Sequence, residues 1–478
     1  MTRIRALLAR FLPQGAILLS VLTFAAYAAG LVRDRIFART YGAGAELDAY
    51  NAAFILPELA LDVLVASGLA APFVPVFTSL RRENADAATR FAQTVLTLAI
   101  MVMGAACLLL LLVAPATVDL IAPGFDEVNR ARYLELFRLM LVTPIVFAAS
   151  ITLGEILVAE RRFLYYALAP ILYNLGIVAG TVLLHDSLGI RAAAVGAVAG
   201  AFLHLGIRVV GMLGSSVPLR FRLDLRLPAL REFVLLMLPK MLSHPIEPLV
   251  FLFFTSVASM LAAGSVSSVS FARNFQSVPV ALFGVSISLA AFPALSAAWA
   301  AGDRAGFRRQ VRTSAITITV LTVASAFALA VVGPLAIEVL LGGGAFDAED
   351  VRVTAAVLAA FALAVPFDAL GHLTARGLYA THNTLLPVLA SLAGFAVTIG
   401  VTLALVEPVD VLAIPLGFGA GAAVRTGLQG LLLVHRIRDG GPTGAGPEPT
   451  AAPSAAPAPA TAAAAPAAPT APAGEGPG

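Results

Sequence analysis

Long apolar stretches recur along most of this 478-residue chain and restrict its fold more than any other feature. A helix needs about 20 mostly apolar residues to cross the hydrocarbon core of a bilayer. Hydrophobic residues make up 59% of the sequence and charged residues 12%, which is too little charge to cover a soluble protein. We therefore expect an all-α integral membrane protein with about twelve transmembrane helices, near residues 14–36, 47–78, 90–113, 133–157, 164–184, 189–212, 230–259, 265–297, 311–335, 352–375, 385–406 and 410–434.

The arginines between these stretches predict an orientation. Cytoplasmic loops of membrane proteins carry an excess of basic residues. If the N-terminus lies inside, the inner loops hold most of the loop arginines, whereas the outer loops are glycine-rich or acidic, as at 342–344 and 347–350. The formal net charge of +3 then reflects topology, and we expect no nucleic-acid partner. These charges predict a multi-pass protein of a bacterial inner membrane with both termini in the cytoplasm.

A weak internal repeat divides the spans into two sets of six. Ala43-Gly44 precedes a span with a proline and a Phe-Val-Pro motif, and Ala263-Gly264 precedes a similar span with Pro279 and Phe-Pro. Duplicated lobes are typical of alternating-access transporters, although chance similarity between proline-bearing apolar helices is an alternative. We predict an N-lobe at 1–222, a C-lobe at 223–438 and a disordered Pro/Ala-rich tail at 439–478.

Two arginines fall within or at the ends of predicted spans, where an ionisable group is costly unless it is paired or hydrated. Arg33 lies at the end of the first span, in the sequence Arg-Asp-Arg, and Arg273 lies about nine residues into the eighth, without an acidic residue within one turn. Guanidinium groups bind phosphate well. We expect both to face a central, net positive cavity from opposite lobes, with snorkelling to the interface as the alternative.

Further ionisable residues in the spans are candidates for ion coupling. Lys240, His244 and Glu247 have the spacing of one helical face, and Asp368 and His372 are four residues apart. Each set could carry protons or sodium ions, or it could be a self-neutralising structural pair. We predict that Lys240 and Glu247 interact.

Enzyme motifs are missing from the sequence. Pro239 precedes Lys240, so no phosphate-binding Walker loop exists there, and there is no zinc-protease helix, Cys/His cluster or serine elbow. Cys107 is the single cysteine. We therefore expect neither an enzyme nor a metal or organic cofactor.

Short motifs along residues 15–435 resemble the MurJ/MviN family of the multidrug/oligosaccharidyl-lipid/polysaccharide exporter superfamily. They are Gly-Leu-Val-Arg-Asp at 30–34, Gly-Ala-Gly at 42–44, Asp-Ala-Tyr at 48–50, Phe-Ile-Leu-Pro at 54–57, Phe-Val-Pro-Val-Phe at 73–77, Ala-Pro-Gly-Phe at 122–125, Arg-Phe at 162–163, Gly-Ser-Val-Ser at 264–267 and Gly-Leu-Tyr at 377–379. The resemblance implies a flippase that moves lipid II, an undecaprenyl-pyrophosphate-linked glycan, between leaflets by alternating access. It also implies a MATE/MurJ-like fold of two six-helix lobes around a cationic cavity.

Carried over residue by residue, the resemblance places Arg33, Asp34 and Asp48 at positions of the family motif. Tyr27 and Asn274 stand where the family has arginines, with Arg273 shifted by one residue. Leu61, Ser277 and Asn383 also replace charged residues of the family. We therefore take as substrate-binding candidates Arg33, Asp34, Asp48, Arg273, Asn274 and Tyr27.

The expected partners are a lipid-linked oligosaccharide and membrane lipids, and we expect a monomer. The lost arginines leave three alternatives to lipid II transport. These are a flippase for another lipid-linked glycan, an ion-coupled multidrug exporter of the same superfamily, and a transport-inactive scaffold for envelope synthesis.

Overall fold

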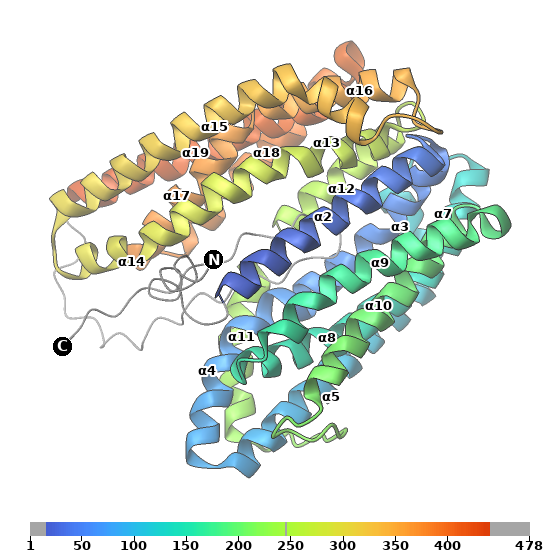
Figure 1. Cartoon of the computed structure of the whole chain (residues 1–478). Helices are drawn as coiled ribbons and strands as arrows, with labels where there is room; N and C mark the ends of the chain where they lie inside the picture. The colour runs from blue at the N-terminus through green and yellow to red at the C-terminus, as the bar shows by residue number, and fades with distance from the viewer. Residues whose placement is uncertain (1–15, 244–245, 440–478) are drawn as a thin grey trace, which may run out of the picture.

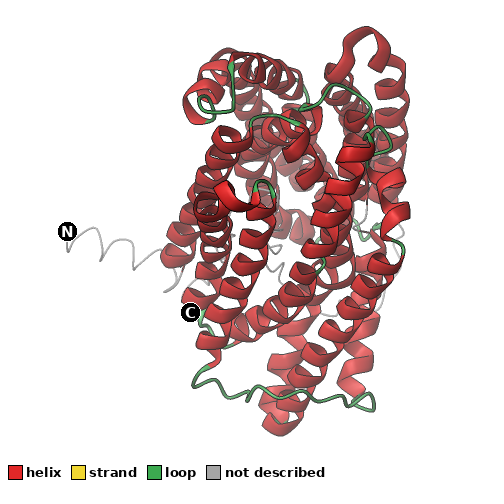
Figure 2. Cartoon of the chain, turned by 90° about the vertical axis from the view of Figure 1, so that its right-hand side faces the viewer, coloured by secondary structure: helices red, strands yellow, loops and turns green. Residues whose placement is uncertain are grey.

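The computed structural model describes residues 16–243 and 246–439 (Figure 1). Within these ranges the chain forms helices joined by loops and turns, without a β-strand (Figure 2). This all-α architecture is the predicted one. Residues 440–478 of the predicted tail lie outside the described residues.

The first half of the chain forms a series of helices, and two of them, α3 and α4, are joined directly by a π-turn. They are α2 (Ala16–Tyr41), α3 (Ala45–Leu61), the π-turn η1 (Asp62–Ala66), α4 (Ser67–Glu83), α5 (Ala85–Leu112), α6 (Ala114–Ile121), α7 (Glu127–Met140), α8 (Val142–Ala159), α9 (Phe163–Leu188) and α10 (Arg191–Met212). The link from 213 to 227 contains no helix and leads into the second half.

The second half follows a similar plan. It contains α11 (Pro228–Ser243), α12 (Ile246–Ser259), α13 (Ser265–Pro279), the π-turn η2 (Val280–Val285), α14 (Ser286–Ala300), α15 (Arg304–Leu340), α16 (Ala348–Ala362), α17 (Val365–Ala380), α18 (Leu385–Val409), the 3-10 turn η3 (Asp410–Leu412) and α19 (Ala413–Asp439).

Each predicted span coincides with one of these helices or with a run of two. By length and composition, eight described helices or runs can cross a membrane, or nine if the bent pair α16 and α17 is one span. One of the eight runs joins α18 and α19, which correspond to two predicted spans. The protein is therefore a multi-pass membrane protein, while the count of twelve crossings stays a prediction. The predicted span 311–335 is too short, because α15 begins at Arg304, where Asp303 caps the helix by accepting a hydrogen bond from Gly306 N–H.

The internal repeat has a clear structural counterpart. The runs α3–η1–α4 and α13–η2–α14 each begin after an N-cap glycine, and each contains a π-turn after a proline, Pro57 or Pro279. A helical proline removes one backbone hydrogen bond, and a π-turn is a common place for the helix to adjust. The two halves thus share an interrupted helix at equivalent positions, as pseudo-symmetric lobes require.

Glycines bring the last two helices of each half close together. In α9, Gly176 and Gly180 lie against Gly200 and Gly196 of α10, with no room for a Cβ atom on either side. In the second half, Gly417 and Gly421 of α19 lie against Thr402 and Thr398 of α18 in the same way. Small residues four apart favour close helix packing in membranes, where burial of apolar surface contributes little.

The two halves meet at one end of the molecule and diverge toward the other (Figure 1). At the meeting end, Ala345 N–H donates to Arg39 C=O, and Ala43 N–H donates to the Asp350 carboxylate. The ends of α4 and α14 lie at the diverging side of the ribbon in Figure 1. The helix α11 packs against α4 and α5 of the first half. The boundary between lobes near residue 222 stays a prediction.

Candidate translocation site

Asp48 ties the two halves together where they meet. It lies in the first turns of α3, and its carboxylate accepts hydrogen bonds from Gly264 N–H at 2.7 Å and Ser267 N–H at 2.8 Å. The Ser267 hydroxyl donates a third bond at 2.6 Å. These donors belong to the N-terminus of α13, where a negative charge is favourable. A side chain of one half therefore caps a helix of the other.

Gly264 has to be a glycine for this contact to form. Its φ of +92° lies in the left-handed region, which residues with a Cβ atom rarely adopt. A Cβ atom at this position would also collide with the backbone carbonyl of Ala43. The Gly-Ser-Val-Ser motif at 264–267 thus supplies both the turn and the donors that Asp48 uses.

Arg33, Asp34 and Asn274 form a second link between the halves. The Nε and Nη2 atoms of Arg33 donate to one oxygen of Asp34, at 3.0 and 2.8 Å. The other oxygen of Asp34 accepts a hydrogen bond from Asn274 Nδ2 at 3.0 Å. Residues 240 positions apart, which the sequence analysis had selected separately, are thus in direct contact.

Arg273 is buried beside Asn274 and has partners from three other helices. Its guanidinium lies 3.6 Å from Glu247 of α12 and 3.7 Å from Asp368 of α17, and it donates a hydrogen bond to Gln276. It also stacks near the rings of Phe251 and Phe418, about 5 Å from each centroid. The sequence contains no acidic neighbour of Arg273, whereas the folded chain provides two.

Asp368 joins Arg273 to a residue that the sequence analysis missed. Arg425 of α19 donates to Asp368 at 2.8 Å, and Gln276 donates to the same carboxylate at 3.4 Å. Asp368 lies in the first turn of α17, just after a 42° bend between α16 and α17. Arg425 was visible in the sequence as a lone arginine within the predicted span 410–434.

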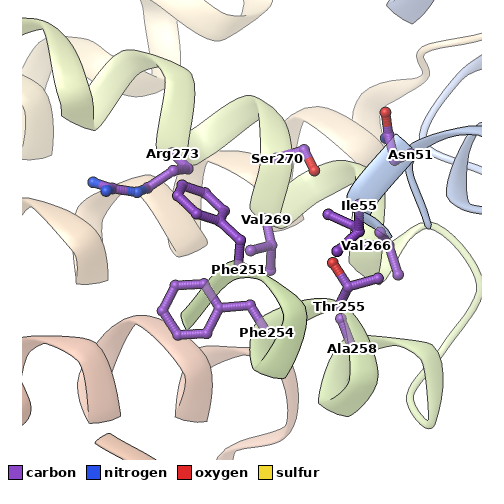
Figure 3. A pocket seen from close by; sticks show the side chains of 10 residues that line it. All are labelled: Asn51, Ile55, Phe251, Phe254, Thr255, Ala258, Val266, Val269, Ser270 and Arg273. Carbon is purple, nitrogen blue, oxygen red and sulfur yellow. The ribbon is translucent and has the colours of Figure 1, made fainter. Parts of the chain in front are cut away.

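A small pocket lies between the halves next to this network, with about 340 Å³ of empty volume. Asn51 and Ile55 of α3 line one side, and residues of α12 and α13 line the other, including Phe251, Ser270 and Arg273 (Figure 3). Figure 3 shows the Arg273 side chain leaving the pocket beside the Phe251 ring. The pocket joins aromatic, polar and cationic side chains at one place.

Tyr27 and His372 are the remaining candidates whose side chains the structure describes. Tyr27 is partly buried in α2, six residues before Arg33. Lys240 lies in α11. Its side chain and the whole of His244 lie outside the described part of the structure. His372 is one turn after Asp368 and interacts with it electrostatically, but the ion pairs of Asp368 are with Arg273 and Arg425.

The predicted single face of Lys240, His244 and Glu247 stays a prediction. The described part of α11 reaches Ser243 and that of α12 starts at Ile246, so His244 lies outside the described residues. Glu247 lies 3.6 Å from Arg273, and the predicted pairing of Lys240 with Glu247 also stays a prediction.

Three arginines and three acidic residues meet in this site, so their formal charges balance. The arginines are Arg33, Arg273 and Arg425, and the acids are Asp34, Asp368 and Glu247. A guanidinium paired with a carboxylate can exchange that partner for a phosphate. Both the planar carboxylate and the tetrahedral phosphate present two oxygens that accept hydrogen bonds from the guanidinium N–H groups. Because these charges already balance, an anionic group that displaces a carboxylate would leave that carboxylate without its cation, and these six residues alone do not form the net positive cavity that the sequence predicts.

Comparisons with known proteins agree with this architecture. A sequence model of the family described as "Lipid II flippase MurJ" matches residues 37–442. The chain belongs to the MurJ family. Its MurJ relatives include a probable lipid II flippase of Thermotoga maritima, 28% identical, with 84% of this chain and 79% of the relative aligned. A lipid II flippase of Burkholderia cenocepacia is 26% identical, with 86% and 81% aligned.

Solved structures show that the MurJ-like fold is shared more widely. A lipid II flippase MurJ in an inward closed conformation matches with a TM-score of 0.75 at 22% identity, over 88% of this chain and 87% of that one. An inward-facing multidrug resistance MATE family transporter of the MOP superfamily also gives a TM-score of 0.75, at 14% identity, over 88% and 98%. These likenesses confirm the predicted MATE/MurJ-like fold of two lobes.

Proposed function

We propose that this protein is a flippase for a lipid-linked glycan, with lipid II as its cargo. The observation that carries the proposal is an arginine–carboxylate network between the two halves of a chain that belongs to the MurJ family. Relatives with 23–28% identity bear the name lipid II flippase or probable lipid II flippase.

The arginines provide binding partners for the negative charge of such a cargo, which is its main energetic obstacle to crossing the membrane. Moving the charged headgroup through hydrocarbon without a partner is prohibitive. In this proposal the pyrophosphate takes the place of Asp34 or Asp368 on a guanidinium, and the carboxylate reclaims the arginine when the headgroup leaves. Arg425 adds a cation to the second half, whereas Tyr27 and Leu61 replace two family arginines in the first half.

The transport cycle in this proposal is alternating access in a bacterial inner membrane. With both termini in the cytoplasm, the end where Asp48 caps α13 faces outward, and the diverging end of Figure 1 faces the cytoplasm. The headgroup would enter from the inner leaflet and leave after the Asp48 contact opens. Coupling to protons or sodium ions completes the cycle and requires no organic cofactor.

A second candidate function is the ion-coupled export of drugs. It is favoured by the aromatic and acidic surroundings of Arg273, where Phe251, Phe418, Glu247 and Asp368 meet, since cationic drugs bind aromatic faces and carboxylates. The likeness to multidrug transporters supports the fold that this function needs.

Complementation in a strain depleted of its own lipid II flippase tests the proposal. The wild-type chain should restore growth, and Arg33→Ala and Arg273→Gln should not, although both accumulate in the membrane. Arg130→Gln is the control, since Arg130 is paired with Asp119 on the surface. Failure of the wild type, together with export of cationic dyes, would favour the drug exporter. Neither activity in a folded protein would favour the scaffold.

A further inference from the structure

A second group of buried polar residues lies wholly inside the first half, apart from the site between the halves. It is formed where α8, α9 and α10 pack side by side (Figure 1). The group consists of Glu155 of α8 and of His204 and Arg208 of α10. Each of these residues is only 4–5% exposed. Neither the family motifs nor the site described above uses these residues.

Arg208 is held in place by α8 and α9. Its Nη1 atom donates to Ser150 C=O at 2.6 Å, and its guanidinium lies 5.0 Å from the centroid of the Tyr166 ring. Gly154 makes room for it, since a Cβ atom there would lie 2.5 Å from Nη1. The Nε atom of Arg208 is buried without a hydrogen-bond partner. The guanidinium is thus fixed in position but not fully satisfied.

Glu155 has no direct partner in the part of the chain that the structure describes. Its carboxylate makes neither a hydrogen bond nor an ion pair there, and the cation that acts on it electrostatically is Arg208. His204 is occupied by Ser150, whose Oγ lies 2.8 Å from Nδ1. A buried carboxylate without a hydrogen-bond donor is costly inside a membrane span, so such residues are functional candidates.

The other elements packed on α8 do not satisfy Glu155. Beyond Arg208, His204 and the Tyr166 hydroxyl, their charged groups include Glu58 of α3, Asp62 of η1, Arg81 of α4, Arg90 of α5 and Arg138 of α7. None of these makes a hydrogen bond or ion pair with the Glu155 carboxylate among the described residues. Whether the Glu155 carboxyl carries a charge therefore depends on two opposing effects: burial disfavours the charged form, and the positive charge of Arg208 favours it.

We propose that Glu155 binds and releases a transported proton, and that Arg208 and Gly154 set the geometry of this site. A proton from water adds to a carboxylate oxygen and gives a neutral carboxylic acid, and the reverse step returns it to water. No other bond changes. The site lies four residues before the end of α8 and of α10, so under the predicted orientation it is close to the cytoplasm. Proton release on that side fits a cycle driven by proton entry.

The first experiment does not depend on the cargo. Infrared difference spectra of the purified full-length protein, recorded across a pH titration, should contain a buried carboxylic C=O band. The band should disappear in Glu155→Gln and persist in Glu135→Gln, a control on the surface of α7. An identical titrating band in wild type and Glu155→Gln would overturn the proposal.

The second experiment rests on the proposed function. In proteoliposomes that flip a lipid-linked glycan, an imposed proton gradient should accelerate the wild type and the Glu135→Gln control but not Glu155→Gln. Equal acceleration of all three would overturn the proposal even if flipping itself is established. If Glu155→Gln does not accumulate, Glu155→Gln combined with Arg208→Gln removes both charges and allows the same two measurements.

Discussion

Asp48 on α3 accepts hydrogen bonds from both the backbone N–H and the hydroxyl of Ser267, which lies in the first turn of α13 in the other half. We predict that Asp48→Asn weakens the closure of this end by about 1.5–3 kcal/mol, the usual worth of hydrogen bonds to a charged group. Distances between spin labels at Glu127 and Ala348, in a background without Cys107, should lengthen or broaden. Asp119→Asn, a surface substitution in α6, should leave them unchanged. An unchanged distribution in Asp48→Asn would show that the contact does not hold the halves together.

The pair of Asp368 and Arg425 should be energetically coupled. Asp368→Asn leaves Arg425 without the carboxylate it pairs with, at a cost of about 3–5 kcal/mol, whereas Arg425→Gln should cost less, because Asp368 keeps its contact with Arg273. We expect Asp368→Asn and Arg425→Gln each to lower thermal stability in detergent, and the double variant to lose less than the sum. Additive losses would show that the residues act independently. The exposed pair of Glu349 and Arg352 is the control, where the double variant should lose about the sum of the two single losses.

Gly154→Ala should displace the guanidinium of Arg208, because the added methyl would lie 2.5 Å from its Nη1 atom. We expect a loss of about 1–3 kcal/mol, as for overpacking in a tight core. Thermal melts should be compared with those of Gly104→Ala in α5, where the added methyl would meet no atom within 4 Å. Equal melting temperatures for the two variants would contradict the predicted crowding.

Glu160, in the loop after α8, should contribute stability that depends on pH. Burial raises the pKa of its carboxyl, but hydrogen bonds from Ser216 and Ser215 and the charge of Arg81 outweigh burial, so the pKa lies below its ordinary value. The stabilisation is therefore present above the unfolded pKa of about 4.3 and is lost as the pH falls through the folded value. Melts of wild type and Glu160→Gln between neutral and acidic pH should converge at the acidic end. A constant difference would contradict this assignment.

The C-terminal tail should be dispensable, because its Pro/Ala-rich composition offers little to bury. A chain truncated after Arg438 should insert and accumulate like the full-length protein. Membrane fractionation and size-exclusion profiles provide the measurement. A truncated chain that aggregates or is degraded would assign the tail a role.

The sequence predicts the helices and several residues of the site, but not their partners. Apolar length locates the spans, and short motifs lead to Arg33, Asp34, Asp48 and Asn274. The partners of Arg273 were not predictable, because Glu247 and Asp368 come from other helices and depend on tertiary packing.

Two further groups were visible in the sequence but were not recognised. Arg425 stands alone in an apolar span, and the rule that led to Arg273 applies to it equally. Glu155 and Arg208 each lie close to the end of a span, beside loop arginines, so they resemble the charged flanks that topology alone explains. Their burial became evident only when α8 and α10 were seen to pack together.

The π-turns η1 and η2 give two long helices a place where one residue can be lost without a change of register. A π-turn accommodates one more residue than the regular helix, and each residue of an α-helix turns the chain by about 100°. Deleting one residue within 62–66 would therefore let α3 and α4 continue as one regular helix, with the side chains of α4 close to their present faces. Phe73 and Phe77 would stay buried. A deletion in a regular part of the same helix would instead rotate every later side chain by about 100°, so two deletions that leave the same hydropathy profile should differ sharply in their effect on folding.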